Sequence, residues 1–385
     1  MYNPTTVISQ LLQILDKNQF DTFVKNHNAD KYAKTFSTWN QLVVMVTAQI
    51  KGWDSLREVQ TGFETKSNKL YHLGLKETPK RSNLAYANSK RSFEIYQSLF
   101  NTLLKKVVGK TSVDNEFGAP LNILDSTTID LCLNLFPWAK FRKTKGALKL
   151  HTSFDYDNQI PTFVNITNGK APDSIKLFND LSVYRNTILT FDRGYLDFKQ
   201  FNKLDKHEVT FITRIREDIK FKIIGQHAEA NNQYLIDDCI IELTRSHDKY
   251  PKKLRLVVYW DRVTEKTYKF LTNDFERDAL TIAKIYKARW DIELFFKWIK
   301  QNLKIKTFLG TSKNAVMMQI WVAMIVYLLI WYISKNAKKI RGVLELTRIL
   351  REMLFESISI VDLLAKKFRS KTREKPPDNL QLMLF

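Results

Sequence analysis

Short runs of alternating apolar and polar residues in the middle of the chain predict β-strands, and two segments between them have helical spacing. In chain order the pattern gives three strands, a helix, a strand, a helix and a strand. The expected helices are 173–181 and 196–204, and the expected strands are 121–125, 147–155, 162–166, 186–192 and 209–215. The pattern therefore predicts a mixed α/β domain that begins near residue 116.

Further alternating segments predict a β-rich insertion over 216–276. The expected strands of the insertion are 221–224, 235–243, 254–260 and 267–271. A connection of this length in a compact domain must contain structure of its own. Helical spacing resumes over 277–335, where the α/β domain is expected to continue.

Both ends of the chain also predict helices. Residues 1–115 are expected to form a separate small domain, and 336–385 a helical region with a basic tail. Within 316–333, Gln319 is the only strongly polar residue, and this segment is long enough to cross a membrane. Because a strongly basic helix directly precedes it, we interpret it as a helix buried across the core sheet and expect no membrane partner.

The net charge is strongly positive, because 61 Lys and Arg side chains face 40 Asp and Glu and leave +21. No single low-complexity block carries this excess. A polyanion with a long footprint is therefore the expected partner, since neutralising phosphates releases counterions. Ribosomal and membrane-surface proteins share such a balance, so charge alone does not identify the polyanion.

Neither cysteine nor histidine indicates a metal site. Cys132 and Cys239 lack metal-ligand spacing, and the six histidines are scattered without pairing. The N-terminus lacks a basic segment followed by an apolar one, which argues against secretion. We therefore expect a protein of the reducing cytoplasm without a zinc site.

The spacing of polar residues between 285 and 303 is the most informative motif. In a helix, Tyr286, Arg289, Glu293 and Lys300 fall within an arc of roughly 60° beside an apolar face. A carboxylate flanked by an aromatic hydroxyl and two cations suits chemistry on a phosphodiester. The alternative is an ordinary amphipathic helix with a solvated basic face.

Two aspartates upstream favour the catalytic interpretation. Asp125 ends the run 121–125, and Asp192 ends the apolar strand that starts at 186. Ligands bind at the carboxyl ends of parallel strands in open α/β sheets, so these carboxylates and Glu293 are expected to converge on divalent cations. Taken singly, each aspartate is also typical of a turn or of a helix N-cap.

These residues resemble the motifs of a known family. Tyr286-x2-Arg289-x3-Glu293-x6-Lys300 matches the Y-R-E-K signature of one large family of bacterial insertion-sequence transposases. Asp192-Arg193-Gly194-Tyr195 resembles the D-R-G-Y box of that family, and Asp125-Ser126-Thr127 resembles its first aspartate box. The matches extend over about residues 120–305.

The resemblance implies a DDE transposase with an RNase H-like catalytic core and a β-rich insertion between the second aspartate and the glutamate. The apolar spacing in residues 1–115 adds the expected helical N-terminal domain. The first and fourth strands of that core lie side by side, which brings the two aspartates together. The expected activity is cut-and-paste transposition, in which DNA is hydrolysed at the terminal inverted repeats and the ends are joined to target DNA. The family also implies a hairpin intermediate and a homodimer on double-stranded DNA, in the bacterial cytoplasm with the nucleoid.

On this resemblance, Asp125, Asp192 and Glu293 are the expected catalytic and metal-binding residues. They would hold two Mg²⁺ ions, for which Mn²⁺ is expected to substitute because all the ligands are oxygens.

The other residues of the Y-R-E-K signature and of the D-R-G-Y box are expected to contact DNA. Arg289 and Lys300 would bind phosphates near the cut strand, and Tyr286 would donate a hydrogen bond to one. Arg193 and Tyr195 are further expected DNA contacts.

Two segments outside these boxes carry further candidate DNA contacts. A predicted helix that Ser82 would cap is flanked by cations, and we expect it to read the inverted repeat, although a solvated surface helix fits nearly as well. Its basic residues are Lys80, Arg81, Lys90 and Arg91. Trp260 ends a predicted strand of the insertion, where it either stacks on an unpaired base at the cut end or packs against the sheet.

Two other functional classes stay open. A structure-selective nuclease on the same fold would use the same three acids and cleave without joining strands. A DNA-binding protein with a decayed active site would keep the charge and lack the chemistry. Metal-dependent nicking and joining of DNA that carries the element's ends distinguishes the three.

Overall fold

The computed structural model describes residues 5–108, 115–140, 145–175, 180–228, 233–302, 308–336 and 342–365. They form two compact units that are each discontinuous in sequence. The first unit comprises the described residues of Met1–Thr111, Ile129–Leu148 and Phe296–Phe368, and the second those of Ser112–Thr128 and Lys149–Phe295. The basic tail expected near the C-terminus lies outside the described residues.

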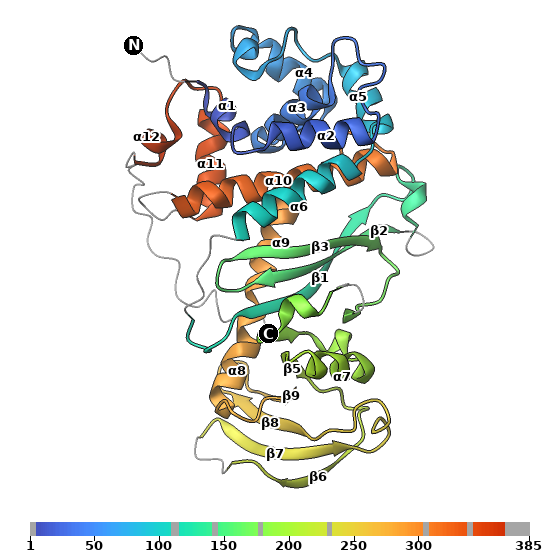
Figure 1. The fold of residues 1–385 in the computed structure, drawn as a ribbon, viewed down its shortest axis with the longest axis vertical. Coiled ribbons are helices and arrows are strands. Elements are labelled where there is room, and N and C mark those ends of the chain that lie inside the picture. The colour runs from blue at the N-terminus through green and yellow to red at the C-terminus, as the bar shows by residue number, and fades with distance from the viewer. Residues whose placement is uncertain are drawn as a thin grey trace. The chain divides into compact units, whose positions relative to one another are not determined.

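The first unit is helical (Figure 1). Its α-helices are α1 (Val7–Leu12), α2 (Lys17–Asn26), α3 (Thr38–Lys51), α4 (Leu56–Glu64), α5 (Arg81–Lys90), α6 (Glu94–Val108), α10 (Lys313–Asn336), α11 (Val343–Met353) and α12 (Ile360–Ala365), with 3₁₀ segments η1 (Ser67–Leu73) and η2 (Pro137–Ala139). Local signals define these helices well. Ser37 and Asn40 form a capping box at the start of α3, and Gly52, with φ of 72°, ends it in the left-handed conformation.

The long apolar segment forms α10, which has the length and composition of a membrane span. However, 94% of its most apolar 18-residue stretch is buried inside the protein. The expectation that this helix is buried is confirmed. Its predicted position across the sheet is wrong, because its main partners are the helices α3, α5, α6 and α11. An all-round apolar helix needs partners on every side, and here other helices supply them.

Gln319, a polar side chain in this apolar helix, has a structural role. Its Oε1 accepts a hydrogen bond of 2.9 Å from the buried backbone N–H of Leu309. We expect Gln319→Leu to destabilise the protein by about 1–3 kcal/mol in urea unfolding, although it makes α10 more apolar, because it leaves that N–H without an acceptor. Met318→Leu, at the neighbouring buried position, is the control and should cost less. Equal stability of the Gln319→Leu variant and the natural protein would contradict this role.

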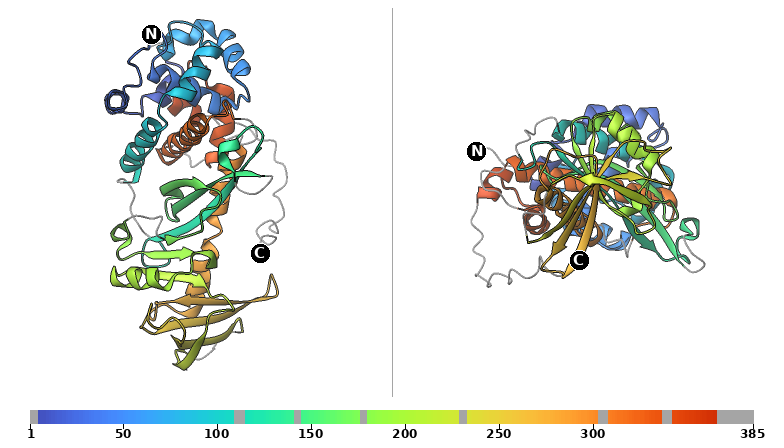
Figure 2. Two further views of the ribbon diagram at one scale, coloured as in Figure 1. Left: turned by 90° about the vertical axis from the view of Figure 1, so that its right-hand side faces the viewer. Right: turned by 90° about the horizontal axis from the view of Figure 1, so that it is seen from below.

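A nine-stranded sheet has the order β3-β2-β1-β4-β5-β9-β8-β7-β6, and its strands fan out with the usual twist (Figure 2). The strands are β1 (Leu121–Leu131), β2 (Gly146–Asp155), β3 (Ile160–Asn168), β4 (Ile188–Phe191), β5 (Thr210–Arg214), β6 (Phe221–Gln226), β7 (Leu235–Leu243), β8 (Leu254–Asp261) and β9 (Lys266–Thr272). As expected, the first and fourth strands are parallel neighbours. The insertion strands extend the same sheet, because β9 pairs antiparallel with β5.

The second unit also contains α7 (Phe198–Lys206), α8 (Ala279–Ala288), the start of α9 (Asp291–Asn302), and the 3₁₀ segments η4 (Ser182–Tyr184) and η5 (Arg193–Tyr195). Alternation along the strands builds one core on each face of the sheet. Ile188 and Ile212 pack with residues of α8, whereas Leu189 and Phe211 pack with residues of α7. β4 and β5 are therefore buried between α8 on one face and α7 on the other, which suits their nearly continuous apolar sequences.

The largest differences from the predicted elements concern three of them. β1 does not end at Asp125 but continues to Leu131, because alternating burial persists along it. The single helix expected over 285–303 is interrupted at Arg289 and Trp290, where i→i−3 hydrogen bonds replace the regular pattern. The helix expected at 173–181 is not seen at its first two residues, and 176–179 lie outside the described residues.

Candidate active site

The two aspartates lie next to each other because of the register between β1 and β4. The last parallel pair of that ladder is Leu124 with Phe191, so Asp125 and Asp192 follow it directly on neighbouring strands. Asp125 is largely buried, whereas Asp192 is half-buried and precedes the 3₁₀ segment η5. The register thus brings together two carboxylates that are far apart in sequence.

Arg289 links Asp125 to the glutamate. Its Nη1 atom lies 2.6 Å from Oδ2 of Asp125 and 3.9 Å from Oε1 of Glu293, while its guanidinium packs 4.9 Å from the ring of Trp290. Burial disfavours the charge on Arg289, but the nearby Asp125, Asp192 and Glu293 keep the pKa of Arg289 above its ordinary value. Arg289 therefore lies beside two of the three acids, and the charge of Asp192 also acts on it.

The acids also act on one another. Burial raises the pKa of Asp125 to about 7, against the opposing effects of Arg289 and of the Ser126 backbone N–H, and the charges of Glu293 and Asp192 raise it further. Among the described residues, no group of three Asp, Glu, His or Cys side chains is arranged to hold a metal ion. In this conformation the Asp125 carboxylate is bound to Arg289 instead.

A fourth acid, Asp173, connects the two aspartate boxes. Its Oδ1 accepts a hydrogen bond of 2.6 Å from Ser126 Oγ, and its Oδ2 lies 3.0 Å from Nζ of Lys149. A side chain added at Gly194 would lie 3.5 Å from the same carboxylate, so the box that follows Asp192 packs closely against it. This role is not evident from the sequence, because an acid after a proline is typical of a helix start.

His151 lies buried beside this carboxylate, with Nδ1 at 3.8 Å from Oδ1 of Asp173. Burial lowers the pKa of His151 to about 4, although Asp173 opposes this shift, so the imidazole is neutral at pH 7. Lys149 is thus the charged partner of Asp173 in this cluster.

Two predicted DNA contacts are buried. Tyr286 is 3% exposed and packs against Phe270 with ring centroids 5.0 Å apart, and Tyr195 is 2% exposed and packs against Phe191. Neither ring reaches the surface, so direct contact of either with DNA is not supported by this conformation. The apolar positions around each tyrosine account for its burial.

The other predicted DNA contacts of the second unit and of α9 are more accessible. Arg193 is exposed directly after Asp192, and Lys300 is exposed in the last turn of α9. Trp260 is half-buried near the end of β8, opposite Thr267 of β9, and both of its predicted roles stay predictions.

In the first unit, Lys80, Arg81 and Lys90 are exposed, as a contact with DNA requires. The predicted cap at Ser82 is wrong, because α5 already begins at Arg81, whose backbone N–H donates to Oε1 of Gln60.

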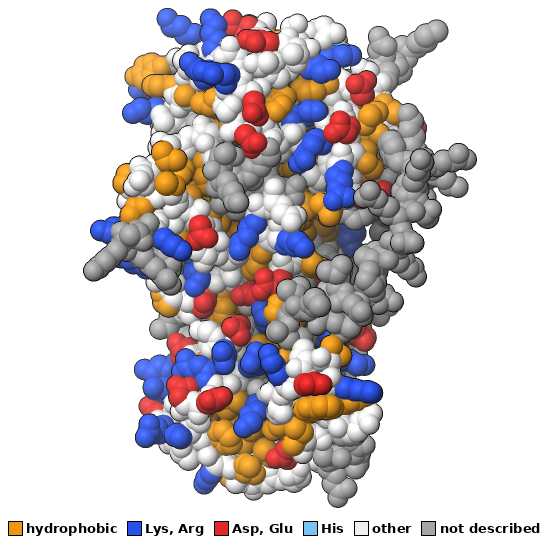
Figure 3. All heavy atoms as spheres, turned by 180° about the vertical axis from the view of Figure 1, so that it is seen from behind, with side chains coloured by type: hydrophobic (Ala, Val, Ile, Leu, Met, Phe, Trp, Pro, Cys, Tyr) orange, Lys and Arg blue, Asp and Glu red, His pale blue; other side chains and the backbone are white. Residues whose placement is uncertain are grey.

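Arg91 differs from these three cations. Its guanidinium donates to the Phe36 carbonyl and to Gln41 Oε1 and lies 3.4 Å from Asp30, so Arg91 holds the local fold together. Basic side chains occur over the whole face drawn in Figure 3, in line with a charge excess that no single block carries.

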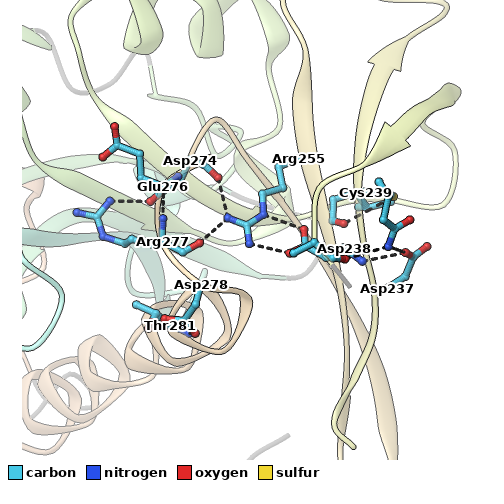
Figure 4. Close-up of polar contacts among 12 residues, drawn as sticks. Asp237, Asp238, Cys239, Arg255, Asp274, Glu276, Arg277, Asp278 and Thr281 are labelled. Carbon is cyan, nitrogen blue, oxygen red and sulfur yellow. Dashed lines mark hydrogen bonds and ion pairs between the residues drawn. The ribbon is translucent and has the colours of Figure 1, made fainter. Parts of the chain in front are cut away.

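A buried ion pair fixes the approach to α8. Arg255 on β8 donates two hydrogen bonds of 2.8 Å to Asp238 on β7, and both side chains are almost completely buried (Figure 4). The same guanidinium donates to the carbonyls of Asp274 and Arg277, in the turn between β9 and α8. The orientation of α8, and with it the position of Arg289, therefore rests on Arg255.

We expect Arg255→Met to destabilise the second unit by about 3–5 kcal/mol, because it leaves the Asp238 carboxylate buried without a counter-charge. Urea unfolding measures this loss. Arg185→Met is the matched control, since it removes an exposed pair with Glu208 and should cost far less stability. Similar losses in the two variants would rule out the proposed importance of the buried pair.

The part of the chain that contains the three acids matches known proteins. A family model described as "Transposase DDE domain" matches residues 116–329, more than half of the chain, and a model described as a domain of unknown function (DUF4372) matches residues 3–76. A protein of Sinorhizobium fredii named as transposase y4zB is 32% identical over 284 residues, which are 72% of this chain and 78% of the relative.

A second relative, from Geobacillus stearothermophilus, is named as a probable transposase for insertion sequence element IS5377. It is 27% identical over 257 residues, which are 65% of this chain and 67% of the relative. Among solved structures, the piggyBac transposase synaptic complex with hairpin DNA aligns over 94% of this chain and 80% of its own, at 10% identity. Its TM-score of 0.42 is too low to show a common fold.

Proposed function

The chain belongs to the family of transposases with a DDE domain, and on this basis we propose that it performs cut-and-paste transposition of an insertion sequence. In this proposal it hydrolyses DNA at the terminal inverted repeats of its element and then joins the freed ends to target DNA. The observation that supports the proposal is that Arg289 lies beside both Asp125 and Glu293, while Asp192 follows the strand next to that of Asp125.

The catalytic core is proposed to be RNase H-like. Its support is the strand order β3-β2-β1-β4-β5, with β1, β4 and β5 parallel and with α7 and α8 on opposite faces of β4 and β5. Strands β6 to β9 would be the insertion between the second aspartate and the glutamate, and the helices before residue 115 would contact DNA.

Three carboxylates suit hard divalent cations, and Mg²⁺, with Mn²⁺ as a substitute, is the proposed cofactor. The crowding of the acids supports this fit, because the raised pKa of Asp125 reflects burial together with negative charges that a divalent cation would neutralise. When bound, the metal would activate water and stabilise the leaving oxygen at the scissile phosphate.

The remaining roles belong to side chains of the protein. Arg289 keeps the Asp125 carboxylate in place and would contact a phosphate once that carboxylate has another cation. The ring centroid of Tyr286 lies 5.9 Å from Cζ of Arg289, and this packing would help to orient the guanidinium. Lys300 and Arg193 are exposed and would bind phosphates of the cut strand.

Assembly and location are part of the same proposal. Two ends must be cut in one complex, so we expect a homodimer on double-stranded DNA. The protein would act on the bacterial chromosome in the cytoplasm, and the burial of α10 within the first unit fits that setting.

We expect Asp125→Asn, Asp192→Asn and Glu293→Gln each to lower cleavage by about a thousandfold or more, because each removes several kcal/mol of charge stabilisation at the phosphate. The measurement is nicking and strand joining on DNA that carries the native inverted repeats. DNA binding should persist, and chelating divalent cations should have the same effect as the substitutions.

Glu217→Gln, which removes an exposed acid of the same unit, is the control and should cut normally. Normal cutting by any of the three site variants would refute the assignment. Cutting without joining in the natural protein would identify a nuclease, and DNA binding without cutting would identify a decayed enzyme.

Asp173 is proposed to position the Asp125 strand through Ser126. Asp173→Ala should lower cleavage about 10- to 100-fold and raise the Mg²⁺ concentration needed for half-maximal rate, because supporting contacts of metal ligands have effects of this size. Asp173→Asn should lose less, since it still offers an acceptor to Ser126.

The matched control is Asp180→Ala, because Asp180 also accepts a hydrogen bond of 2.6 Å from a serine, Ser182, but does so on an exposed segment. An unchanged Mg²⁺ dependence in Asp173→Ala would show that the acid only supports folding.

A further inference from the structure

A cleft in the first unit lies between the loop after α2 and helix α5. It has a volume of about 510 Å³, which is in the range of small-ligand sites. Residues 27–36 form one wall, and Asn83, Tyr86 and Lys90 of α5 form part of the other. These three side chains recur every three or four residues, so they share one face of the helix.

The cleft presents positive charge. Lys34 and Lys90 line it, and within the part of the chain that the structure describes neither lysine has a carboxylate partner. The nearby acids are already engaged, because Asp30 accepts hydrogen bonds from Thr38 and faces Arg91, and Glu94 lies 3.7 Å from His27. An anion would therefore be attracted to the cleft, whose lining includes no Asp or Glu side chain.

Two tyrosines project from its walls. Tyr32 is 86% exposed and Tyr86 is 69% exposed, although aromatic rings of this size usually bury most of their surface. A ring that is flat, apolar on its faces and accessible is a stacking platform for a nucleobase. The two rings line the same cleft as Lys34 and Lys90, which is the pairing that a nucleotide needs for its base and its phosphate. Lys31 Nζ lies 5.5 Å from the Tyr32 ring, so Tyr86 offers the more open face.

The shape of the cleft selects the form of DNA. A duplex keeps its bases stacked and presents grooves to protruding elements, so it does not fill a concave site of this size. A base that has left the helix, or that lies at a frayed or cut end, exposes both its faces and its phosphate and does fit. Asn83 adds an amide that can both donate to and accept from a base edge.

We propose that this cleft binds an unpaired nucleotide of DNA, with its base against Tyr86 and Tyr32 and its phosphate on Lys34 and Lys90. The inference rests on the proposed function only in taking DNA as the ligand. No feature of the catalytic acids enters it, so binding in the cleft and cleavage at the acids can fail separately.

The test uses the full-length protein and a short single-stranded deoxyoligonucleotide that carries one 2-aminopurine, whose fluorescence falls when it stacks on an aromatic ring. The natural protein should bind this strand more tightly than the duplex of the same sequence and should quench the 2-aminopurine. Tyr86→Ala and Tyr32→Ala should each weaken binding about 5- to 150-fold, as the loss of one stacked base predicts. Tyr86→Phe should restore both affinity and quenching.

Tyr71→Ala is the matched control, because Tyr71 is 79% exposed in the same unit but does not line the cleft. Lys34→Gln and Lys90→Gln should reduce the salt dependence of binding, whereas Lys105→Gln on the exposed side of α6 should not. Equal effects of Tyr71→Ala and Tyr86→Ala, or tighter binding of the duplex, would overturn the proposal. Asp125→Asn should lose cleavage and still quench the 2-aminopurine, because the cleft does not involve the acids.

Discussion

The central constraint on this protein is the repulsion among acids that its fold brings together. Two carboxylates about 4 Å apart near a protein surface repel each other by about 4 kcal/mol at an effective dielectric constant of 20. Arg289 offsets part of this cost with a contact of 2.6 Å to Asp125. The rise of the Asp125 pKa to about 7 shows that the compensation is incomplete, because burial and the charges of Glu293 and Asp192 still disfavour its ionised form.

The rest of the second unit keeps these groups from moving apart. Asp125 and Asp192 are held by the parallel register of β1 and β4, and Arg289 is held by α8. The start of α8 depends in turn on Arg255, whose guanidinium is shared between Asp238 and two turn carbonyls. Regular elements and a satisfied buried network position side chains more precisely than loops do. The like charges are therefore held together by rigid strands and by a hydrogen-bond network whose residues lie far from them in sequence.

Much of this arrangement could be predicted from the sequence, because it depends on short-range patterns. The strands and their sequence along the chain follow from alternation, and the adjacency of β1 and β4 follows from the family resemblance that the motifs carry. The break at Arg289 and Trp290 could not be predicted, since a helix with one turn of 3₁₀ geometry keeps the same apolar period. Asp173 was also missed, because its partners Ser126 and Lys149 are 47 and 24 residues away and only the folded sheet brings them together. The burial of Tyr195 and Tyr286 likewise depends on the packing of whole layers.

The sign of the charge at the site explains why the strongly basic composition matters. A cluster of three carboxylates repels the phosphates on which a transposase acts, so a positive surrounding field is needed for DNA to approach at all. The excess of +21 supplies that field over the chain, but it cannot reverse the potential within a few ångströms of Asp125, where Arg289 is the nearest cation and is itself 8% exposed. Local reversal requires ions bound by the acids themselves, since a bound divalent cation is the largest charge in such a site. Long-range attraction by lysine and arginine and short-range neutralisation by metal are thus separate requirements, and the sequence meets them with different residues.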